Sequence, residues 1–146
     1  MVDAAGPVSV LLVEDDPSDV IMVEEALADW GVPTILHVAH DGVQATEFLR
    51  REGGYADAPR PALILLDLNM PRKGGLEVLA DIKYDENLQT IPVVVFSTSS
   101  EPGQIMASYL SHANAYVVKP TDFDDFSRVV QQIDQFYTRT VTPPAA

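Results

Sequence analysis

Short runs of apolar residues alternate along the chain with longer segments in which apolar positions recur every three or four residues. The apolar runs have the length of buried strands, and we expect strands at residues 8–13, 34–38, 63–66, 93–96 and 115–118. Between the first two runs, Val20, Val23, Ala26 and Leu27 show the spacing of an amphipathic helix. The pattern therefore predicts alternating strands and helices over most of the chain.

Capping signals support the helices. Asp16 is a predicted N-cap, Pro17 suits the first turn, and Gly31 ends the first helix. The last helix is expected to run from 122 to about 137. We expect one domain at 8–138, because 146 residues suffice for a single core, with short tails at 1–7 and 139–146.

Strands that alternate with helices are typically joined by right-handed crossovers, which produce a parallel sheet covered on both faces. The expected fold class is α/β, a three-layer doubly wound sheet of five strands. In such a sheet the first strand is usually central, and its carboxyl end lies near that of the third strand. The residues that follow these two strands are then expected to meet.

Polar residues stand where the predicted strands end. Asp67 follows the third strand, Glu14 and Asp15 follow the first, Ser97 ends the fourth and Lys119 ends the fifth. Ligands of open parallel sheets bind at this edge. Each residue alone has a structural alternative: Asp67 as a cap, Lys119 as a surface cation. Together, in this order, they predict one functional site.

The composition excludes several classes of function. The net charge is -13, from 9 basic and 22 acidic residues, which disfavours binding to a nucleic-acid backbone. The chain has no cysteine, which excludes disulfides, thiolate nucleophiles and cysteine-ligated zinc. No apolar run approaches the roughly 20 residues that span a membrane, and the first residues carry no basic segment. We expect a cytoplasmic protein that does not bind membranes.

The motifs resemble the receiver domain (CheY-like) of bacterial two-component response regulators. The similarity extends from about residue 8 to 137 and rests on Glu14-Asp15, the segment 67–71 (Asp-Leu-Asn-Met-Pro), Ser97-Thr98 and Lys119-Pro120. It implies a flavodoxin-like (βα)5 fold with strand order 2-1-3-4-5. It also implies that Asp67 accepts a phosphoryl group from a sensor histidine kinase.

A narrower similarity is to the stand-alone response regulators that are paired with bacterial phytochromes. It rests on the segments 55–61, 71–75, 82–83, 108–109 and 113–117. This resemblance implies a bacteriophytochrome as the kinase and a homodimer formed through the last helix and neighbouring surface. A histidine phosphotransfer protein is an alternative partner in the phosphorelay.

The resemblance also implies a metal site. Mg²⁺, with Mn²⁺ as an alternative, would be held by Asp15, Asp67 and the backbone carbonyl of Asn69, while Glu14 would act through water. Such a hard cation prefers oxygen ligands and neutralises carboxylates that would otherwise repel a phosphoryl group. The family more often has aspartate at the position of Glu14, so the longer side chain is expected to change metal affinity or the arrangement of water.

Three further roles follow from the family. Lys119 and Ser97 would bind oxygens of the phosphorylated aspartate. On phosphorylation the Ser97 hydroxyl would move inward and the Tyr116 side chain would follow it, which makes this pair a conformational switch. If the Tyr116 hydroxyl has a buried partner, the residue belongs to the core instead. The bond before Pro120 is expected to be cis. Catalysis would be limited to autophosphorylation, from a phosphohistidine or a small phosphodonor, and slow autodephosphorylation.

Two other functions compete with this interpretation. A Mg²⁺-dependent phosphohydrolase of the haloacid-dehalogenase type also forms an aspartyl phosphate, but it needs a second aspartate two residues later, where this chain has Asn69. A flavin mononucleotide binder would need a small-residue phosphate loop after the first strand. Here that loop is Glu14-Asp15-Asp16, which would repel a phosphate.

Overall fold

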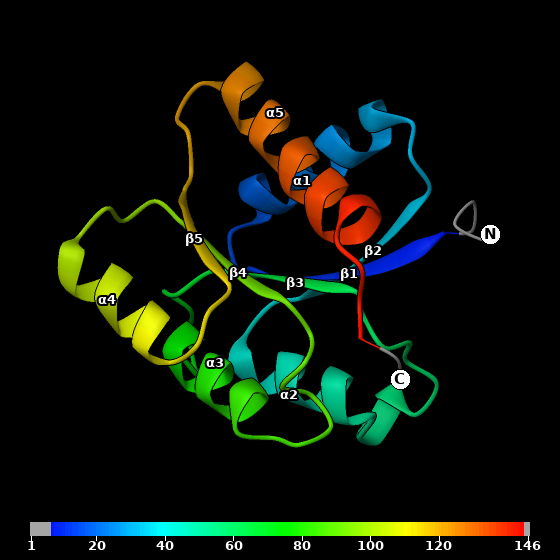
Figure 1. Cartoon of the computed structure of the whole chain (residues 1–146), viewed down its shortest axis with the longest axis vertical. Coiled ribbons are helices and arrows are strands. Elements are labelled where there is room, and N and C mark those ends of the chain that lie inside the picture. Colours follow the sequence, from blue (N-terminus) through cyan, green and yellow to red (C-terminus); the bar gives the residue numbers. More distant parts are fainter. Residues whose placement is uncertain (1–6, 145–146) are drawn as a thin grey trace.

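The computed structural model describes residues 7–144, in which a five-stranded parallel sheet lies between two layers of helices (Figure 1). The strands are β1 (Val8–Val13), β2 (Thr34–Ala39), β3 (Leu63–Leu66), β4 (Val93–Ser97) and β5 (Ala115–Val118). Their order is β2-β1-β3-β4-β5. This topology confirms the predicted doubly wound, flavodoxin-like fold.

Helices cover both faces of the sheet. In Figure 1, α1 (Pro17–Trp30) and α5 (Phe123–Asp134) lie above it, and α2 (Gly42–Arg50) and α3 (Gly75–Lys83) lie below it. The helix α4 (Pro102–Leu110) lies beside α3 near β5. A short 3₁₀ turn (Gly53–Tyr55) follows α2. No helix in the described part of the chain is long and apolar enough to cross a lipid bilayer.

The all-apolar sequence of β3 results from burial on both of its faces. Leu63 and Leu65 pack with α1 and α5, whereas Ile64 and Leu66 pack in the cluster beneath the sheet with α2 and α3. All four side chains are buried. A strand covered on both sides needs apolar residues at every position, which is why the run at 63–66 identifies the centre of the sheet.

The end of the chain differs from the sequence-based expectation. The helix α5 passes at Asp134 into a wider π-helical turn, Gln135–Thr140, so Arg139 and Thr140 belong to a helical turn and not to the predicted tail. The Asp134 carboxylate is buried and accepts a hydrogen bond from the Thr34 hydroxyl at 3.2 Å. The Thr138 hydroxyl donates to the Asp134 carbonyl at 2.7 Å. Residues 1–6 of the predicted amino-terminal tail lie outside the described residues.

Gly75, the first residue of α3, packs directly against the backbone of the β3–α3 loop. A Cβ at Gly75 would lie 2.3 Å from the carbonyl oxygen of Asp67 and 2.6 Å from the Cα of Leu68. Gly75→Ala is therefore expected to destabilise the protein by about 2–3 kcal/mol, because backbone must shift to admit the methyl group. Urea denaturation measures this loss. Gly54→Ala, with nothing within 4 Å of its Cβ, should change stability by less than about 0.5 kcal/mol; equal effects would contradict the packing account.

Candidate phosphoacceptor and metal site

The carboxyl ends of the strands form an open cleft. Its walls contain Glu14, Asp15, Asp67, Asn69 and Lys119, all of them predicted from the sequence, together with the further residues Asp16, Pro17, Asp19 and Thr98. Ser97, Tyr116 and Pro120 lie outside this lining. The cleft thus brings together the acidic residues of β1 and β3 and the lysine that follows β5.

Sheet pairing places the acidic residues side by side. Val13 and Leu66 are register partners in the parallel pair β1–β3, so the residues that follow them leave the sheet together. The Asp67 amide donates to the Val13 carbonyl at 3.0 Å, and the Glu14 amide donates to the Ala39 carbonyl at 2.9 Å. These bonds extend the backbone hydrogen bonding of the sheet by one residue beyond β1 and β3. They thereby fix the directions of the Glu14 and Asp67 side chains.

Glu14, Asp15 and Asp67 each place a carboxylate oxygen within 4.8 Å of the others. Glu14 and Asp67 are only 2% and 9% exposed, whereas Asp15 is open to solvent. Three carboxylates at this separation repel one another unless a cation is shared among them. Because all the donors are oxygens and one side of the cluster is open to water, the residues fit a hard divalent ion such as Mg²⁺.

The pKa values of the two buried acids reflect this crowding. Burial, reinforced by the charge of Asp67, raises the pKa of Glu14 to about 7, although a hydrogen bond from Lys119 offsets part of the rise. Burial likewise raises the pKa of Asp67, against the opposing charge of Lys119. When they are deprotonated, the three carboxylates of the cluster lie next to the single cation of Lys119, and this negative balance favours binding of a further cation.

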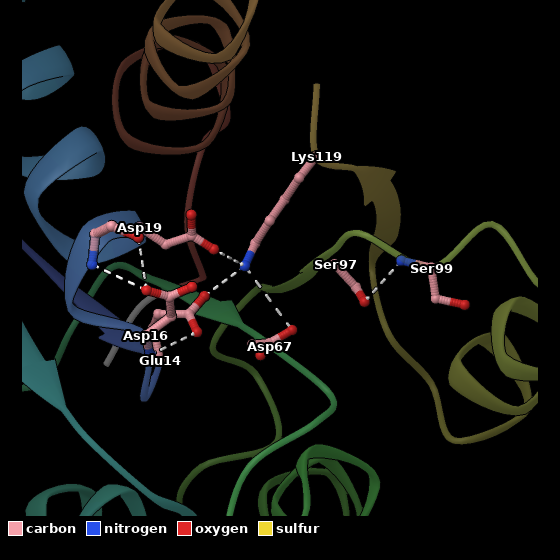
Figure 2. A network of polar contacts seen from close by, with 8 residues as sticks. Glu14, Asp16, Asp19, Asp67, Ser97, Ser99 and Lys119 are labelled. Atoms are coloured by element: carbon pink, nitrogen blue, oxygen red, sulfur yellow. Dashed lines mark hydrogen bonds and ion pairs between the residues drawn. The ribbon is translucent and has the colours of Figure 1, made fainter. Parts of the chain in front are cut away.

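Lys119 lies among three carboxylates (Figure 2). Its Nζ lies 2.5 Å from Glu14 Oε1, 2.7 Å from Asp19 Oδ2 and 3.9 Å from Asp67 Oδ1. Burial alone would lower the pKa of Lys119, but the hydrogen bonds to Asp19 and Glu14 outweigh that effect and raise it. The ammonium group is thus charged and lies next to the predicted phosphoacceptor.

Asp19 is a member of the cleft that sequence reasoning missed. It stands in the first turn of α1, three residues after the N-cap Asp16, and its side chain reaches Lys119 across the strand ends. The sequence signal was an acid in the first turn of a helix that begins directly after Glu14-Asp15. Such an acid also suits the helix dipole on its own, so the pattern does not single it out as a site residue.

Ser97 and Tyr116 are connected through Ser99. The buried Ser97 Oγ accepts a hydrogen bond from the Ser99 amide at 3.3 Å (Figure 2), and the Tyr116 hydroxyl donates to the Ser99 carbonyl at 2.7 Å. Tyr116 is half-buried, and its amide donates to the Tyr109 hydroxyl at 3.1 Å. Tyr116 is therefore held to the β4–α4 loop by a part-buried hydroxyl contact, and the side chains of both predicted switch residues bond to the backbone of Ser99.

The predicted cis bond before Pro120 is absent. No peptide bond in residues 7–144 is cis, so the Lys119–Pro120 bond is trans and this expectation was wrong. A trans bond before proline is favoured by about 0.5–1 kcal/mol, and Lys119 reaches Glu14 and Asp19 from the trans backbone.

A second set of charged contacts holds the loop that follows Asp67. Arg72, in a left-handed conformation with φ 65°, donates from two nitrogens to Asp41 Oδ2 at 3.0 and 2.7 Å. Burial alone would raise the pKa of Asp41, but hydrogen bonds from the Gln44 amide and Arg72 hold it below its usual value. Lys73 contacts Thr46 and Asp81. These contacts tie the β3–α3 loop, and with it Asn69, to α2.

Comparison with known proteins agrees with this geometry. The sequence profile of the response regulator receiver domain matches residues 10–131. The chain belongs to the response regulator receiver family. It is a receiver protein of two-component signalling, and the phosphohydrolase alternative is not favoured.

The most similar relatives include phytochrome-associated regulators. The response regulator Rcp1 of Synechocystis sp. is 45% identical over 140 residues, which are 96% of this chain and 95% of Rcp1. The phosphorylated cyanobacterial phytochrome response regulator RcpA superimposes with a TM-score of 0.90 at 45% identity, covering 94% of this chain and 98% of RcpA. The bacteriophytochrome response regulator RtBRR gives 0.75 at 35% identity over 94% of this chain and 81% of RtBRR. The chain is thus homologous to the phytochrome-associated regulators.

The metal site has a counterpart among these relatives. A Mn²⁺-bound form of Rcp1 superimposes with a TM-score of 0.88 at 45% identity, covering 95% of this chain and all of that one. Together with the cluster of Glu14, Asp15 and Asp67, this similarity supports a divalent cation as the ligand of the cleft.

Glu14 is expected to make divalent-metal binding dependent on pH. A metal ion binds the deprotonated carboxylates, and the pKa of Glu14 is raised to about 7. The affinity for Mg²⁺ should therefore fall about tenfold between pH 8 and pH 6, because a proton competes for the site below pH 7. Titration calorimetry measures this change. In Glu14→Gln, whose side chain does not titrate, the affinity should vary much less over the same interval; an unchanged dependence would assign the titration to another group.

Proposed function

We propose that this receiver accepts a phosphoryl group on Asp67, with Mg²⁺ bound, from the phosphohistidine of a sensor histidine kinase. The observation that carries the proposal is the convergence of Asp67 with the acidic pair Glu14-Asp15 and a buried lysine in one cleft. An aspartate with these neighbours can receive a phosphoryl group, because its own negative charge and that of the product are both offset.

The transfer forms a bond between an Asp67 carboxylate oxygen and phosphorus, and it breaks the phosphorus–nitrogen bond of the donor histidine, whose imidazole leaves with its electron pair. Asp15, Asp67 and the Asn69 carbonyl would hold the metal, with Glu14 acting through water. When bound, Mg²⁺ supplies positive charge to the phosphoryl oxygens and the carboxylates. The product is an acyl phosphate, which hydrolyses slowly in the absence of a residue that activates water.

Lys119 would change partners during this reaction. In the structure it is held at 2.5 Å by Glu14 and at 2.7 Å by Asp19, while Asp67 is 3.9 Å away. Phosphoryl oxygens on Asp67 would compete for the ammonium group and draw it toward Asp67. The ammonium group already lies beside the phosphoacceptor before the reaction. It would therefore stabilise the phosphorylated product without a large movement of the backbone.

Ser97 and Tyr116 would transmit the change. If the Ser97 hydroxyl turns to donate to a phosphoryl oxygen, its contact with the Ser99 amide is lost. The β4–α4 loop is then free to move, and the Tyr116 hydroxyl moves with the Ser99 carbonyl to which it donates. The proposed output is a shifted population of conformations at α4 and β5, not a new fold.

The partner surface would include α4, β5 and the start of α5. Large apolar side chains are exposed on all three elements: Met106, Tyr109 and Leu110 on α4, Val118 on β5 and Phe123 on α5. Apolar groups exposed on adjacent elements are typical of protein-binding surfaces. We propose that this surface binds a second copy of the chain or a histidine phosphotransfer protein, in the cytoplasm and without a nucleic-acid partner.

Phosphotransfer profiling tests the proposed kinase. A bacteriophytochrome kinase loaded with labelled phosphate should transfer to this protein at least about tenfold faster than an unrelated sensor kinase does, because cognate docking orients the donor and acceptor. Transfer should stop on removal of Mg²⁺. Equal rates from both kinases would reject the phytochrome partner while leaving the receiver function intact, whereas no transfer from either, nor from a small phosphodonor, would reject both.

A further inference from the structure

Arginines cluster at the edge of the sheet opposite Asp67. Arg50, Arg51 and Arg60, three of the nine basic residues of the chain, line a pocket with a volume of about 430 Å³. Arg60 stands just before β3, and Arg50 and Arg51 stand at the end of α2. In a protein with a net charge of -13, this concentration of guanidinium groups contrasts with the rest of the surface.

The pocket combines this cationic rim with an apolar floor. The floor consists of the buried side chains of Leu49, Pro61, Leu88 and Ile91. Asp85 is the only acid among its lining residues, so the lining has three positive charges and one negative charge, a sum of +2. A ligand that fits needs an anionic end and a body with apolar faces, and the volume is within the range of small-molecule sites.

Most of the guanidinium donors remain available for a ligand. Arg51 Nε donates to the Ala58 carbonyl at 2.9 Å, and Arg60 donates to the Asn87 carbonyl and, at 3.0 Å, to the Thr90 hydroxyl. Within residues 7–144, Arg50 makes only a 3.7 Å ion pair with Asp85. Each guanidinium has five N–H donors, so these contacts position the three exposed arginines and leave several donors without a partner among the described residues.

The end of α2 opposes anion binding, but its effect is reduced here. The carboxyl end of a helix has partial negative charge on its free carbonyls. At α2 the Arg51 amide donates to the Phe48 carbonyl at 3.2 Å, and the Glu52 amide donates to the Glu47 carbonyl at 2.9 Å. These hydrogen bonds satisfy two of the terminal carbonyls, which reduces the partial negative charge that an anion would meet beside the arginines.

From these observations we propose that the pocket binds a small phosphate ester or diphosphate with a planar or apolar body, such as a nucleotide. Planar guanidinium groups bind phosphate through paired N–H donors, and the apolar floor would contact the body of the ligand. The pocket is independent of the proposed phosphorylation, because it lies at the amino ends of β3 and β4, and a ligand there leaves the cleft at Asp67 open.

Nuclear magnetic resonance with adenosine diphosphate and adenosine as probes tests this site. The experiment uses the Asp67→Asn chain in a chelator, which removes the phosphoacceptor and metal as competing sites. Adenosine diphosphate at millimolar concentration should shift the amide signals of residues 49–62 and 85–91, and adenosine, which has no phosphate, should not. Shifts confined to the Asp67 edge, no shifts, or equal shifts with adenosine would overturn the proposal.

Substitutions then test the arginines. Arg50→Gln should weaken binding of adenosine diphosphate about tenfold or more, since a charge-assisted contact is lost, and it should fold normally because Arg50 has only the long contact with Asp85. Arg60→Gln should weaken binding similarly. Arg128→Gln, on the exposed surface of α5, is the matched control and should leave affinity unchanged. Unchanged affinity in both pocket variants would contradict the proposal.

Discussion

Asp67→Asn is expected to abolish phosphotransfer and, at the same time, to raise the melting temperature. The side-chain amide of asparagine does not form an acyl phosphate, so no phosphoryl group should be detected on the variant. The same change removes a buried charge that lies next to Glu14, and burial already raises the pKa of Asp67. The expected gain in stability at pH 8 without metal is on the order of 1 kcal/mol.

The gain in stability should depend on pH in a defined direction. A carboxyl whose pKa is raised on folding destabilises the folded protein above that pKa, and the penalty disappears as the carboxyl becomes protonated at lower pH. The variant should therefore exceed wild type most at pH 8 and least near pH 5. Asp57→Asn, in an exposed loop, should change neither stability nor phosphotransfer. A variant that keeps phosphotransfer, or that melts below wild type at pH 8, would contradict the account.

Lys119→Met should be among the most destabilising single substitutions in the cleft. Lys119 is 7% exposed and contacts two carboxylates within 2.7 Å. Methionine fills a similar volume but leaves Glu14 buried next to Asp67 without a cation, and loss of one member of a buried pair costs about 3–5 kcal/mol. Urea denaturation at pH 8 measures this loss. The variant would also lack the ammonium group that we propose binds the phosphoryl oxygens of phosphorylated Asp67.

A second substitution separates the charge effect from packing. In Lys119→Met combined with Glu14→Gln the unpaired buried charge is absent, so most of the lost stability should return. Lowering the pH toward 6 should have a similar effect in the single variant, because Glu14 has a pKa of about 7 with Lys119 in place and a higher one without it, and is therefore protonated at pH 6. If the double variant is as unstable as the single one, Lys119 stabilises the fold by packing, for example against the Phe96 ring, 5.8 Å from its Nζ.

The sheet could be predicted because its sequence is constrained on two faces. Leu63–Leu66 is apolar at every position because both faces of this strand are buried. Such a run predicts a strand even when the strands that pair with it are not known. The residue after each run is then at the ligand-binding edge, which is how Asp67, Glu14 and Lys119 were found. Local pattern and the general geometry of parallel sheets determine these positions.

Contacts between distant segments could not be predicted in the same way. The Asp19–Lys119 pair joins residues 100 positions apart, and the Arg72–Asp41 pair joins residues 31 apart. Charged residues are common on surfaces, and no local pattern identifies which two meet. The π-helical turn that follows Asp134 likewise involves a contact between distant segments, the hydrogen bond from the Thr34 hydroxyl to the Asp134 carboxylate.

The phosphoacceptor role of Asp67 can be measured by intact-mass spectrometry after incubation with acetyl phosphate and Mg²⁺. We expect one phosphoryl adduct on the wild-type chain, no adduct when the metal is chelated, and no adduct on Asp67→Asn with the metal present. An adduct that persists on Asp67→Asn would place the phosphoryl group on another residue. No adduct on the wild type, together with no response to beryllofluoride, would make Asp67 a structural residue of a partner-binding fold.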